Sequence, residues 1–374
     1  MKKTRVMVVD DSVMFRTLLI NALSADSRFD VVGFAINAMD AMNKIPLYKP
    51  DVLTLDIEMP GMTGLEFLKK LLPKHPIPVV LVSSLNVKVF DALAAGAVDF
   101  VRKPDDQNGI RRDAFLATLI NKVVVASHSR VRLPTAQGFI ISDGAVTQKT
   151  AGGMRSFTAP APAAGMAMGR TAGNLSLKGG NFSDETILAI GASTGGTEAI
   201  LAVMQQFPAK MPGIVITQHM PPGFTAMYAE RLNRLCKVEV REAKHGDRVQ
   251  PGLALLAPGG MQMRLVRMGN GYSVSCSGSE KVSGHCPSVD VLFDSVASIA
   301  RDKAIGVILT GMGADGAAGM LRMRKNGAYT IGQDKESCVV YGMPMEAYKI
   351  GAVCTQVSLN AVASTVIARL ASQK

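Results

Sequence analysis

Residues 187–197 read Ile187-Leu-Ala-Ile-Gly191-Ala192-Ser193-Thr194-Gly195-Gly196-Thr197. The first four are a candidate for a buried strand, and the glycines after them permit a sharp turn into a helix. Residues 191–195 fit the pattern Gly-x-Ser-x-Gly, in which small neighbours expose a serine hydroxyl and helix N-terminal amides can face an oxyanion. The same turn also fits a phosphate-binding loop or a plain connection. Ser193 is therefore a candidate nucleophile whose case depends on the rest of the chain.

Strand patterns continue beyond this turn. Buried-type strands are expected at residues 187–190, 213–217, 253–257 and 304–310. Such apolar runs are typical of parallel sheets covered by helices on both faces. Residues 261–266 and 272–276 alternate in polarity around Gly269-Asn-Gly271, which favours a β-hairpin. We predict that residues 183–374 form an α/β domain with a mainly parallel sheet and a β-hairpin.

The first part of the chain predicts another α/β domain. Short strands are expected at residues 6–9, 31–32, 52–55, 79–82 and 97–101, separated by amphipathic helices. Five strands with helical crossovers imply a doubly wound five-stranded parallel sheet over residues 1–127. Residues 128–182 are rich in Ala, Pro and Gly, which predicts a flexible linker, although Phe139-Ile-Ile-Ser142 leaves local order open.

Composition narrows the class of protein. The 374 residues are 48% hydrophobic, enough for two or three domains with full cores. No apolar run approaches the roughly 18 residues that span a bilayer, and the first run ends at two aspartates, so a cytoplasmic protein is expected. Five irregularly spaced cysteines argue against a disulfide framework or a zinc site. The net charge of +11 comes without a recognisable nucleic-acid-binding motif, which favours an acidic protein partner.

Three carboxylates are predicted to meet in the first domain. Asp10 and Asp11 end its first strand and Asp56 ends its third, and these ends share one edge of a parallel sheet. Like charges this close need a divalent cation, and an all-oxygen set suits Mg²⁺. Ser83 and Lys103 follow the fourth and fifth strands and point to the same edge. Together these groups could hold a phosphoryl group on Asp56.

A second constellation is predicted around Ser193. His219 follows the next strand of a right-handed βαβ unit, which brings it to the same edge. Asp315 lies in the turn after the strand at 304–310, where it could cap a helix or orient an imidazole. All three at one edge favour a Ser-His-Asp hydrolase, in a chain order unlike that of the α/β-hydrolases. His245 and His285 are expected to be structural.

Both constellations resemble a known family. The order Asp10-Asp11, Asp56-Ile-Glu-Met-Pro60, Ser83 and Lys103-Pro104 resembles the response-regulator receiver domain. The catalytic domain of the bacterial chemotaxis protein-glutamate methylesterase (CheB family) is similar to the second domain in these segments: Gly191-Ala-Ser-Thr-Gly-Gly196, Gln218-His-Met-Pro-Pro222, Pro287-Ser-Val-Asp-Val-Leu-Phe293, Thr310-Gly-Met-Gly-Ala-Asp-Gly316 and Tyr341-Gly-Met-Pro344. Together the two resemblances cover nearly the whole chain.

The resemblance implies a regulated hydrolase. A chemotaxis histidine kinase would phosphorylate Asp56 with Mg²⁺ bound, and Ser83 and Lys103 would bind the phosphoryl oxygens. The second domain would hydrolyse glutamate γ-methyl esters on methyl-accepting chemotaxis receptors and deamidate specific glutamines. The chain would then meet the membrane only through those receptors.

The implied ester chemistry needs no metal. His219 would act as the base for Ser193, Asp315 would hold the histidine tautomer, and the backbone amides of Thr194 or Met312 would form an oxyanion hole.

The unphosphorylated receiver would cover Ser193. Residues 83–103 are about one helical turn shorter than the family pattern, which questions how strongly phosphorylation is transmitted.

Two alternatives lack hydrolase activity. A receiver could control a DNA-binding domain, but that predicts a compact helical reader after the linker. Residues 191–196 could bind a nucleotide or phosphate, but they lack the Gly-x-Gly-x-x-Gly spacing and a following lysine.

Overall fold

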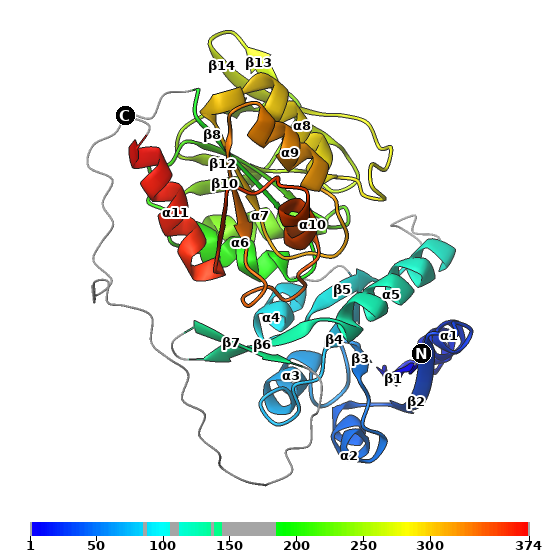
Figure 1. Ribbon diagram of the computed structural model, residues 1–374. Coiled ribbons are helices and arrows are strands. Elements are labelled where there is room, and N and C mark those ends of the chain that lie inside the picture. The colour runs from blue at the N-terminus through cyan, green and yellow to red at the C-terminus, as the bar shows by residue number, and fades with distance from the viewer. Residues whose placement is uncertain (1, 85–87, 105–111, 136–137, 144–184, 373–374) are drawn as a thin grey trace, which may run out of the picture.

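The computed structural model describes residues 2–84, 88–104, 112–135, 138–143 and 185–372 (Figure 1). Most of the predicted linker, residues 144–182, lies outside the described residues. The described chain forms two sheet-containing units that lie against each other, one blue to cyan in Figure 1 and the other green to red. None of the helices in these ranges is both long and apolar enough to cross a lipid bilayer.

The N-terminal unit is a five-stranded parallel sheet in the order β2-β1-β3-β4-β5. Its strands are β1 (Thr4–Val9), β2 (Phe29–Ala35), β3 (Val52–Leu55), β4 (Val79–Ser83) and β5 (Asp99–Arg102). Its helices are α1 (Val13–Ser24), α2 (Ala38–Tyr48), α3 (Gly64–Leu71), α4 (Lys88–Ala94) and α5 (Arg112–Ser127). Buried residues of α1 and α5 cover one face of the sheet, and those of α2, α3 and α4 cover the other. The predicted doubly wound sheet is confirmed.

A short antiparallel pair follows this unit. Strand β6 (Arg130–Thr135) pairs with β7 (Gly138–Asp143). Both lie inside the segment predicted to be a flexible linker, so its first part is ordered, a possibility that Phe139–Ser142 had left open. The backbone N–H of Arg130 donates to the carbonyl of Val339 at 2.9 Å, which ties the start of β6 to the C-terminal unit.

The C-terminal unit is built on a seven-stranded sheet in the order β10-β12-β9-β8-β15-β16-β17, in which every neighbouring pair is parallel. Its strands are β8 (Ile187–Ala192), β9 (Gly213–Gln218), β10 (Glu239–Glu242), β12 (Leu253–Leu256), β15 (Ala304–Ile308), β16 (Tyr329–Gln333) and β17 (Thr355–Val357). A smaller antiparallel sheet contains β11 (Arg248–Val249), β13 (Met263–Met268) and β14 (Gly271–Cys276). The parallel sheet and the β13–β14 hairpin are as predicted.

Helices cover both faces of the large sheet (Figure 1). One face carries α6 (Gly196–Met204), α7 (Phe224–Leu235) and α11 (Leu359–Ser372). The other carries α8 (Val289–Ile299), α9 (Ala317–Lys325) and α10 (Met343–Lys349), with a 3₁₀ turn at Arg301–Lys303. Strands β8 and β9 are buried along their full length, which explains their continuous apolar sequence.

Glycines make the strand-to-helix turns sharp. Gly195 precedes α6 with φ of 76°, and Gly316 precedes α9 with φ of 89°. A residue with a Cβ rarely adopts this left-handed backbone. The turns therefore place the residues just before them, Ser193 and Asp315, at the carboxyl edge of the sheet.

Aromatic side chains join the two units. The Phe90 ring on α4 stacks on Tyr228 of α7, with centroids 5.5 Å apart, and Phe100 of β5 packs 4.5 Å from Phe224. These rings are buried, so a single apolar cluster extends across the boundary. Helix α4, within the short segment at residues 83–103, thus still supplies an aromatic contact to the C-terminal unit.

We expect Gly191→Ala to destabilise the C-terminal unit. A Cβ at Gly191 would lie 2.2 Å from Val289 Cγ1 and 3.1 Å from the Phe293 ring on α8, and relieving such overpacking typically costs about 1–3 kcal/mol. Urea unfolding measures the loss. Gly271→Ala is the control, since its Cβ would meet no atom closer than 4.0 Å. Equal unfolding midpoints for the two variants would contradict tight packing of β8 on α8.

Candidate active site

The structure brings Ser193, His219 and Asp315 together at the carboxyl ends of β8, β9 and β15. Ser193 Oγ lies 3.0 Å from His219 Nδ1, and His219 Nε2 lies 2.7 Å from Asp315 Oδ2. The His219 side chain is 8% exposed and that of Asp315 is 2% exposed. A carboxylate on Nε2 favours the tautomer with its proton there, which leaves the Nδ1 lone pair to accept the serine hydroxyl proton.

The start of helix α8 holds the Asp315 carboxylate. Oδ1 accepts hydrogen bonds from Ser288 Oγ at 2.7 Å and Asp290 N at 3.1 Å, and Oδ2 accepts one from Val289 N at 2.7 Å. Burial alone would raise the pKa of this carboxyl, but the hydrogen bonds from His219, Ser288 and Val289 outweigh it and lower the pKa to about 2. Asp315 is therefore an anion at neutral pH, stabilised by a helix N-terminus.

Backbone contacts fix the position of Ser193. Its N–H donates to Thr310 O at 3.0 Å, and the Gln218 side chain donates from Nε2 to the Ser193 carbonyl at 2.9 Å. Gln218 Nε2 also lies 3.3 Å from the His219 carbonyl, so one buried amide binds the backbone of both residues. A Cβ at Gly311 would lie 2.7 Å from Ser193 Cβ, which shows how closely the β15 turn approaches the serine.

The two predicted oxyanion donors lie in different surroundings. Thr194 is buried beside Ser193, whereas Met312 is 44% exposed in the turn after β15. Within the described residues, the backbone N–H of neither residue donates to an acceptor. Both N–H groups are thus available to a ligand.

An additional histidine ring lies against His219. The His285 ring is parallel to that of His219 within 11°, with centroids 3.6 Å apart. Burial and the charge on His219 lower the pKa of His285 to about 4, which keeps its ring neutral near pH 7. No sequence pattern indicated this contact, because His285 lies 66 positions from His219 in an irregular segment.

The acidic residues of the N-terminal unit also converge. Asp10, Asp11 and Asp56 each offer one carboxylate oxygen, and these oxygens lie within 4.8 Å of one another. Lys103 Nζ lies 2.6 Å from Asp56 Oδ2 and 3.1 Å from Asp10 Oδ2. Burial raises the pKa of Asp56, and the Asp10 charge adds to this, while Lys103 opposes it.

A buried hydroxyl ends β4, the strand next to β3, which leads to Asp56. Among the described residues, Ser83 Oγ has no hydrogen-bond partner although it is inaccessible to solvent. An unpaired buried hydroxyl is costly unless a ligand satisfies it. The hard oxygen ligands fit a divalent cation such as Mg²⁺, and the free hydroxyl fits a phosphoryl oxygen.

The N-terminal unit covers the turn that carries Ser193. Asp99 of β5 accepts a hydrogen bond from Thr194 Oγ1 at 2.5 Å, and its other oxygen lies 2.6 Å from Lys122 Nζ on α5. Arg102 donates to the Pro222 carbonyl at 3.2 Å, and Arg231 of α7 lies 3.1 Å from Asp91 of α4. A buried carboxylate of one unit is therefore bonded to the residue beside the serine of the other.

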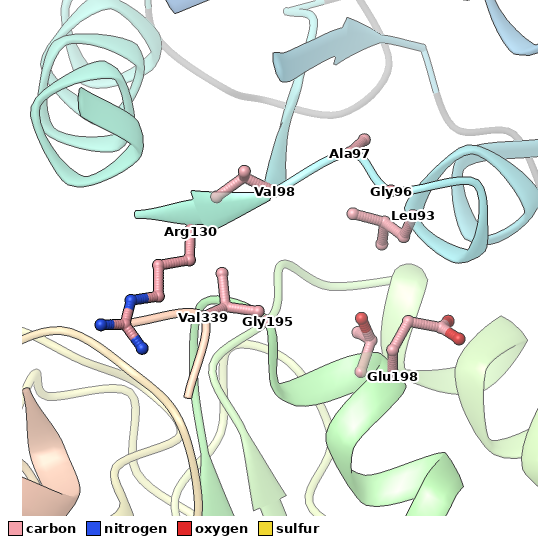
Figure 2. Close-up of a pocket in the computed structure, with 9 residues that line it drawn as sticks. Leu93, Gly96, Ala97, Val98, Arg130, Gly195, Glu198 and Val339 are labelled. Carbon is pink, nitrogen blue, oxygen red and sulfur yellow. The ribbon is translucent and has the colours of Figure 1, made fainter. Parts of the chain in front are cut away.

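Packing is close where this boundary lies over the start of α6. Figure 2 shows Leu93, Ala97 and Val98 of the N-terminal unit facing Gly195 and Val339 of the C-terminal unit. The cavity between them holds about 20 Å³, which is room for about one water molecule. The two units thus meet closely over the start of α6.

Family comparisons agree with both halves of the chain. A family model described as response regulator receiver domain matches residues 6–114, and one described as CheB methylesterase matches residues 188–366. The second match contains Ser193, His219, His285 and Asp315, and the first contains Asp10, Asp11, Asp56, Ser83 and Lys103.

Curated relatives match along the full chain. A protein-glutamate methylesterase/protein-glutamine glutaminase from Syntrophomonas wolfei is 48% identical over 363 residues, covering 96% of this chain and 96% of the relative. A protein of the same description from Escherichia coli O157:H7 is 43% identical over 385 residues, covering 100% of this chain and 98% of the relative. The crystal structure of the Thermotoga maritima CheB methylesterase catalytic domain is 36% identical and covers 49% of this chain and 98% of its own, with a TM-score of 0.48.

We expect Ser288→Ala to weaken the support of Asp315. Loss of a hydrogen bond to a buried anion typically costs about 1.5–3 kcal/mol, measured as the free energy of unfolding at pH 7. The pKa of Asp315 is lowered on folding, so its stabilisation is complete above pH 4 and is lost as the pH falls towards 2. The difference between variant and wild type should therefore shrink at pH 3. Ser298→Ala, on the exposed part of the same helix, is the control, and an equal loss there would contradict this role.

Proposed function

The chain belongs to the CheB methylesterase family, and on this premise we propose that Ser193, His219 and Asp315 hydrolyse glutamate γ-methyl esters on methyl-accepting chemotaxis receptors. The same enzyme deamidates specific glutamines of those receptors. The observation that carries the proposal is the unbroken line of hydrogen bonds from Ser193 Oγ through His219 to Asp315. A nucleophile, a base and an orienting anion in contact are the requirements of serine acyl transfer.

Each step of the reaction has a group in reach. Ser193 Oγ attacks the ester carbonyl while His219 Nδ1 takes its proton, and His219 returns that proton to methanol as the leaving group departs. Water then attacks the acyl-enzyme, His219 takes a proton from it, and Ser193 leaves with that proton. For a glutamine, ammonia replaces methanol as the first leaving group. Asp315 stays ionised throughout and stabilises the imidazolium.

Backbone amides stabilise the tetrahedral intermediate. The N–H groups of Thr194 and Met312 donate to no described acceptor, which supports them as the oxyanion hole. Loss of one such donor typically costs about 100- to 1000-fold in rate. The loop from Thr310 to Gly313 then serves the reaction through its backbone.

The N-terminal domain, residues 1–127, receives the signal. A chemotaxis histidine kinase supplies the phosphoryl group to Asp56, while Asp10, Asp11 and Asp56 hold Mg²⁺. The cation supplies charge neutralisation for phosphoryl transfer to a carboxylate. Ser83 Oγ and Lys103 bind the phosphoryl oxygens, a role supported by the buried, unpaired hydroxyl and by the two ion pairs of Lys103.

In this proposal, the phosphorylated receiver domain and the catalytic domain that it controls lie in one cytoplasmic chain. Residues 128–182 link the receiver to the catalytic domain at residues 183–374. In the unphosphorylated state the receiver covers the Ser193 turn and excludes the receptor helix, and phosphorylation of Asp56 loosens that contact. The hydrogen bond between Thr194 and Asp99 supports this form of control. Receptor methylation then falls when the kinase is active, which gives adaptation in chemotaxis.

The first experiment measures methanol release from methyl-labelled receptor membranes. Wild-type protein should release methanol, and Ser193→Ala should lose roughly 1000-fold or more of the rate, because the attacking oxygen is absent. Addition of Mg²⁺ and a small-molecule phosphodonor should raise the wild-type rate but not that of Asp56→Ala. No release under any condition would contradict the proposed substrate and would point to a ligand-binding role for residues 191–196.

A second experiment tests whether the N-terminal domain inhibits hydrolysis by covering Ser193. Asp99→Ala removes the acceptor of the Thr194 hydroxyl, so we expect about 5- to 150-fold higher methanol release without phosphodonor. Asp26→Ala, whose carboxylate pairs only with nearby Arg28 among the described residues, should keep the wild-type rate. Mg²⁺-dependent phosphorylation of both variants shows that the receiver is folded. An unchanged basal rate in Asp99→Ala would contradict control through this contact.

A further inference from the structure

The stacking of His219 on His285 is unusual for two neutral rings. Aromatic pairs normally lie offset or edge to face with centroids 4.5–7 Å apart, because electron-rich faces repel each other. Here the rings are parallel within 11° and their centroids are 3.6 Å apart. A cation over a ring face is attracted to it instead. The geometry therefore suits a pair in which one ring is protonated and the other is neutral.

The surroundings decide which ring carries the proton. Two positive charges at this separation would repel strongly, so the pair holds at most one proton. His219 has the Asp315 carboxylate 2.7 Å from Nε2. Burial and the charge on His219 lower the pKa of His285, and the charges of Lys122 on α5 and of Lys281 add to this. Asp315 opposes this shift, but the net result is a neutral His285 ring that faces the imidazolium formed when His219 accepts the serine proton.

Backbone hydrogen bonds hold His285 in place. Its N–H donates to the Val282 carbonyl at 2.9 Å, and its carbonyl accepts from Val282 N at 3.0 Å and from Gln262 Nε2 at 3.1 Å. The Gln262 side chain is fully buried, and its Oε1 accepts from Ser288 N at 2.9 Å. One buried amide therefore fixes both the residue that stacks on His219 and the residue that donates to Asp315.

We propose that His285 is a positioning residue for the hydrolysis at Ser193. Its ring face keeps the His219 imidazole in line between Ser193 and Asp315, and it stabilises the imidazolium that forms when His219 accepts the serine proton. It acts through His219 and requires no contact with the receptor. This inference rests on the proposed function, because it assigns a role inside that reaction.

Three variants of the full chain test separately how the flat ring, the charge and the size of the side chain at position 285 affect the reaction rate. His285→Phe keeps a flat neutral ring and should stay within about threefold of the wild-type kcat. His285→Ala removes the ring face and should lower kcat about 3- to 30-fold with little change in KM. His285→Arg places a permanent cation over His219 and should lower kcat further than His285→Ala does. All are assayed with Mg²⁺ and phosphodonor, and exposed His245→Ala is the matched control.

The pH profile distinguishes this role from a structural one. A fixed positive charge disfavours the imidazolium, so His285→Arg should move the acid limb of kcat/KM to lower pH, while His285→Phe should leave it in place. Packing alone would move neither limb. The inference is wrong if the acid limb of His285→Arg stays at the wild-type pH, or if kcat of His285→Ala stays within twofold of wild type. Thermal unfolding of each variant verifies that the protein is folded.

A measurement without substrate provides the second readout. NMR of ¹³C-labelled histidine rings should show His285 titrating near pH 4 in the wild type and at higher pH in His219→Ala, since the neighbouring charge is gone. An unchanged midpoint would overturn the inference. Retained methanol release by Ser193→Ala would instead overturn the proposed function, so the two failures are distinct.

Discussion

The structure depends on a histidine bonded from both sides. His219 meets Ser193 at one ring nitrogen and Asp315 at the other, although these partners lie 26 and 96 positions away in the chain. Only the shared carboxyl edge of β8, β9 and β15 brings them within reach. Asp315 can be buried at this edge because Ser288 and Val289, at the start of α8, donate hydrogen bonds to its carboxylate. Without these donors, a buried carboxylate would be costly. The hydrogen-bonded triad therefore depends both on the order of the strands and on the position of the α8 N-terminus.

The same edge is where the two units meet. The contact combines apolar packing, such as Phe100 against Phe224, with a polar bond from Thr194 to Asp99. Asp99 is buried and shared with Lys122, so separating the units would expose apolar rings and leave that carboxylate with one partner fewer. A mixed contact of this kind is weaker than a domain core and can open when either side changes. Such a contact between the two units is better suited to reversible opening than to a permanent interface.

Sequence patterns predicted much of this arrangement. Strand and helix alternation predicts both sheets, and polar residues that follow strands identify Ser193, His219 and Asp315, because strand ends of a parallel sheet share an edge. Their partners were beyond such reasoning. Ser288 entered only as part of a family-like segment and His285 was expected to be structural, since each acquires its contact only through the path of an irregular segment. The sequence left order at Phe139–Ser142 open but did not predict the pairing of β6 with β7, whose first residue is fixed by a distant carbonyl.

Side-chain contacts and helix α5 together connect the acidic residues to the serine turn. They run through Asp56, Lys103, Phe15, Phe115, Lys122, Asp99 and Thr194, with Phe115 and Lys122 on α5. A phosphoryl group on Asp56 would add about two negative charges beside Lys103, whose ammonium lies 4.6 Å above the Phe15 ring. A shift of Lys103 towards that group would change the packing of Phe15 on α5, and α5 carries Lys122, the partner of Asp99. Thr194 therefore links phosphorylation in the N-terminal unit to ester hydrolysis in the C-terminal unit, because its hydroxyl binds Asp99 while its backbone amide lies beside Ser193.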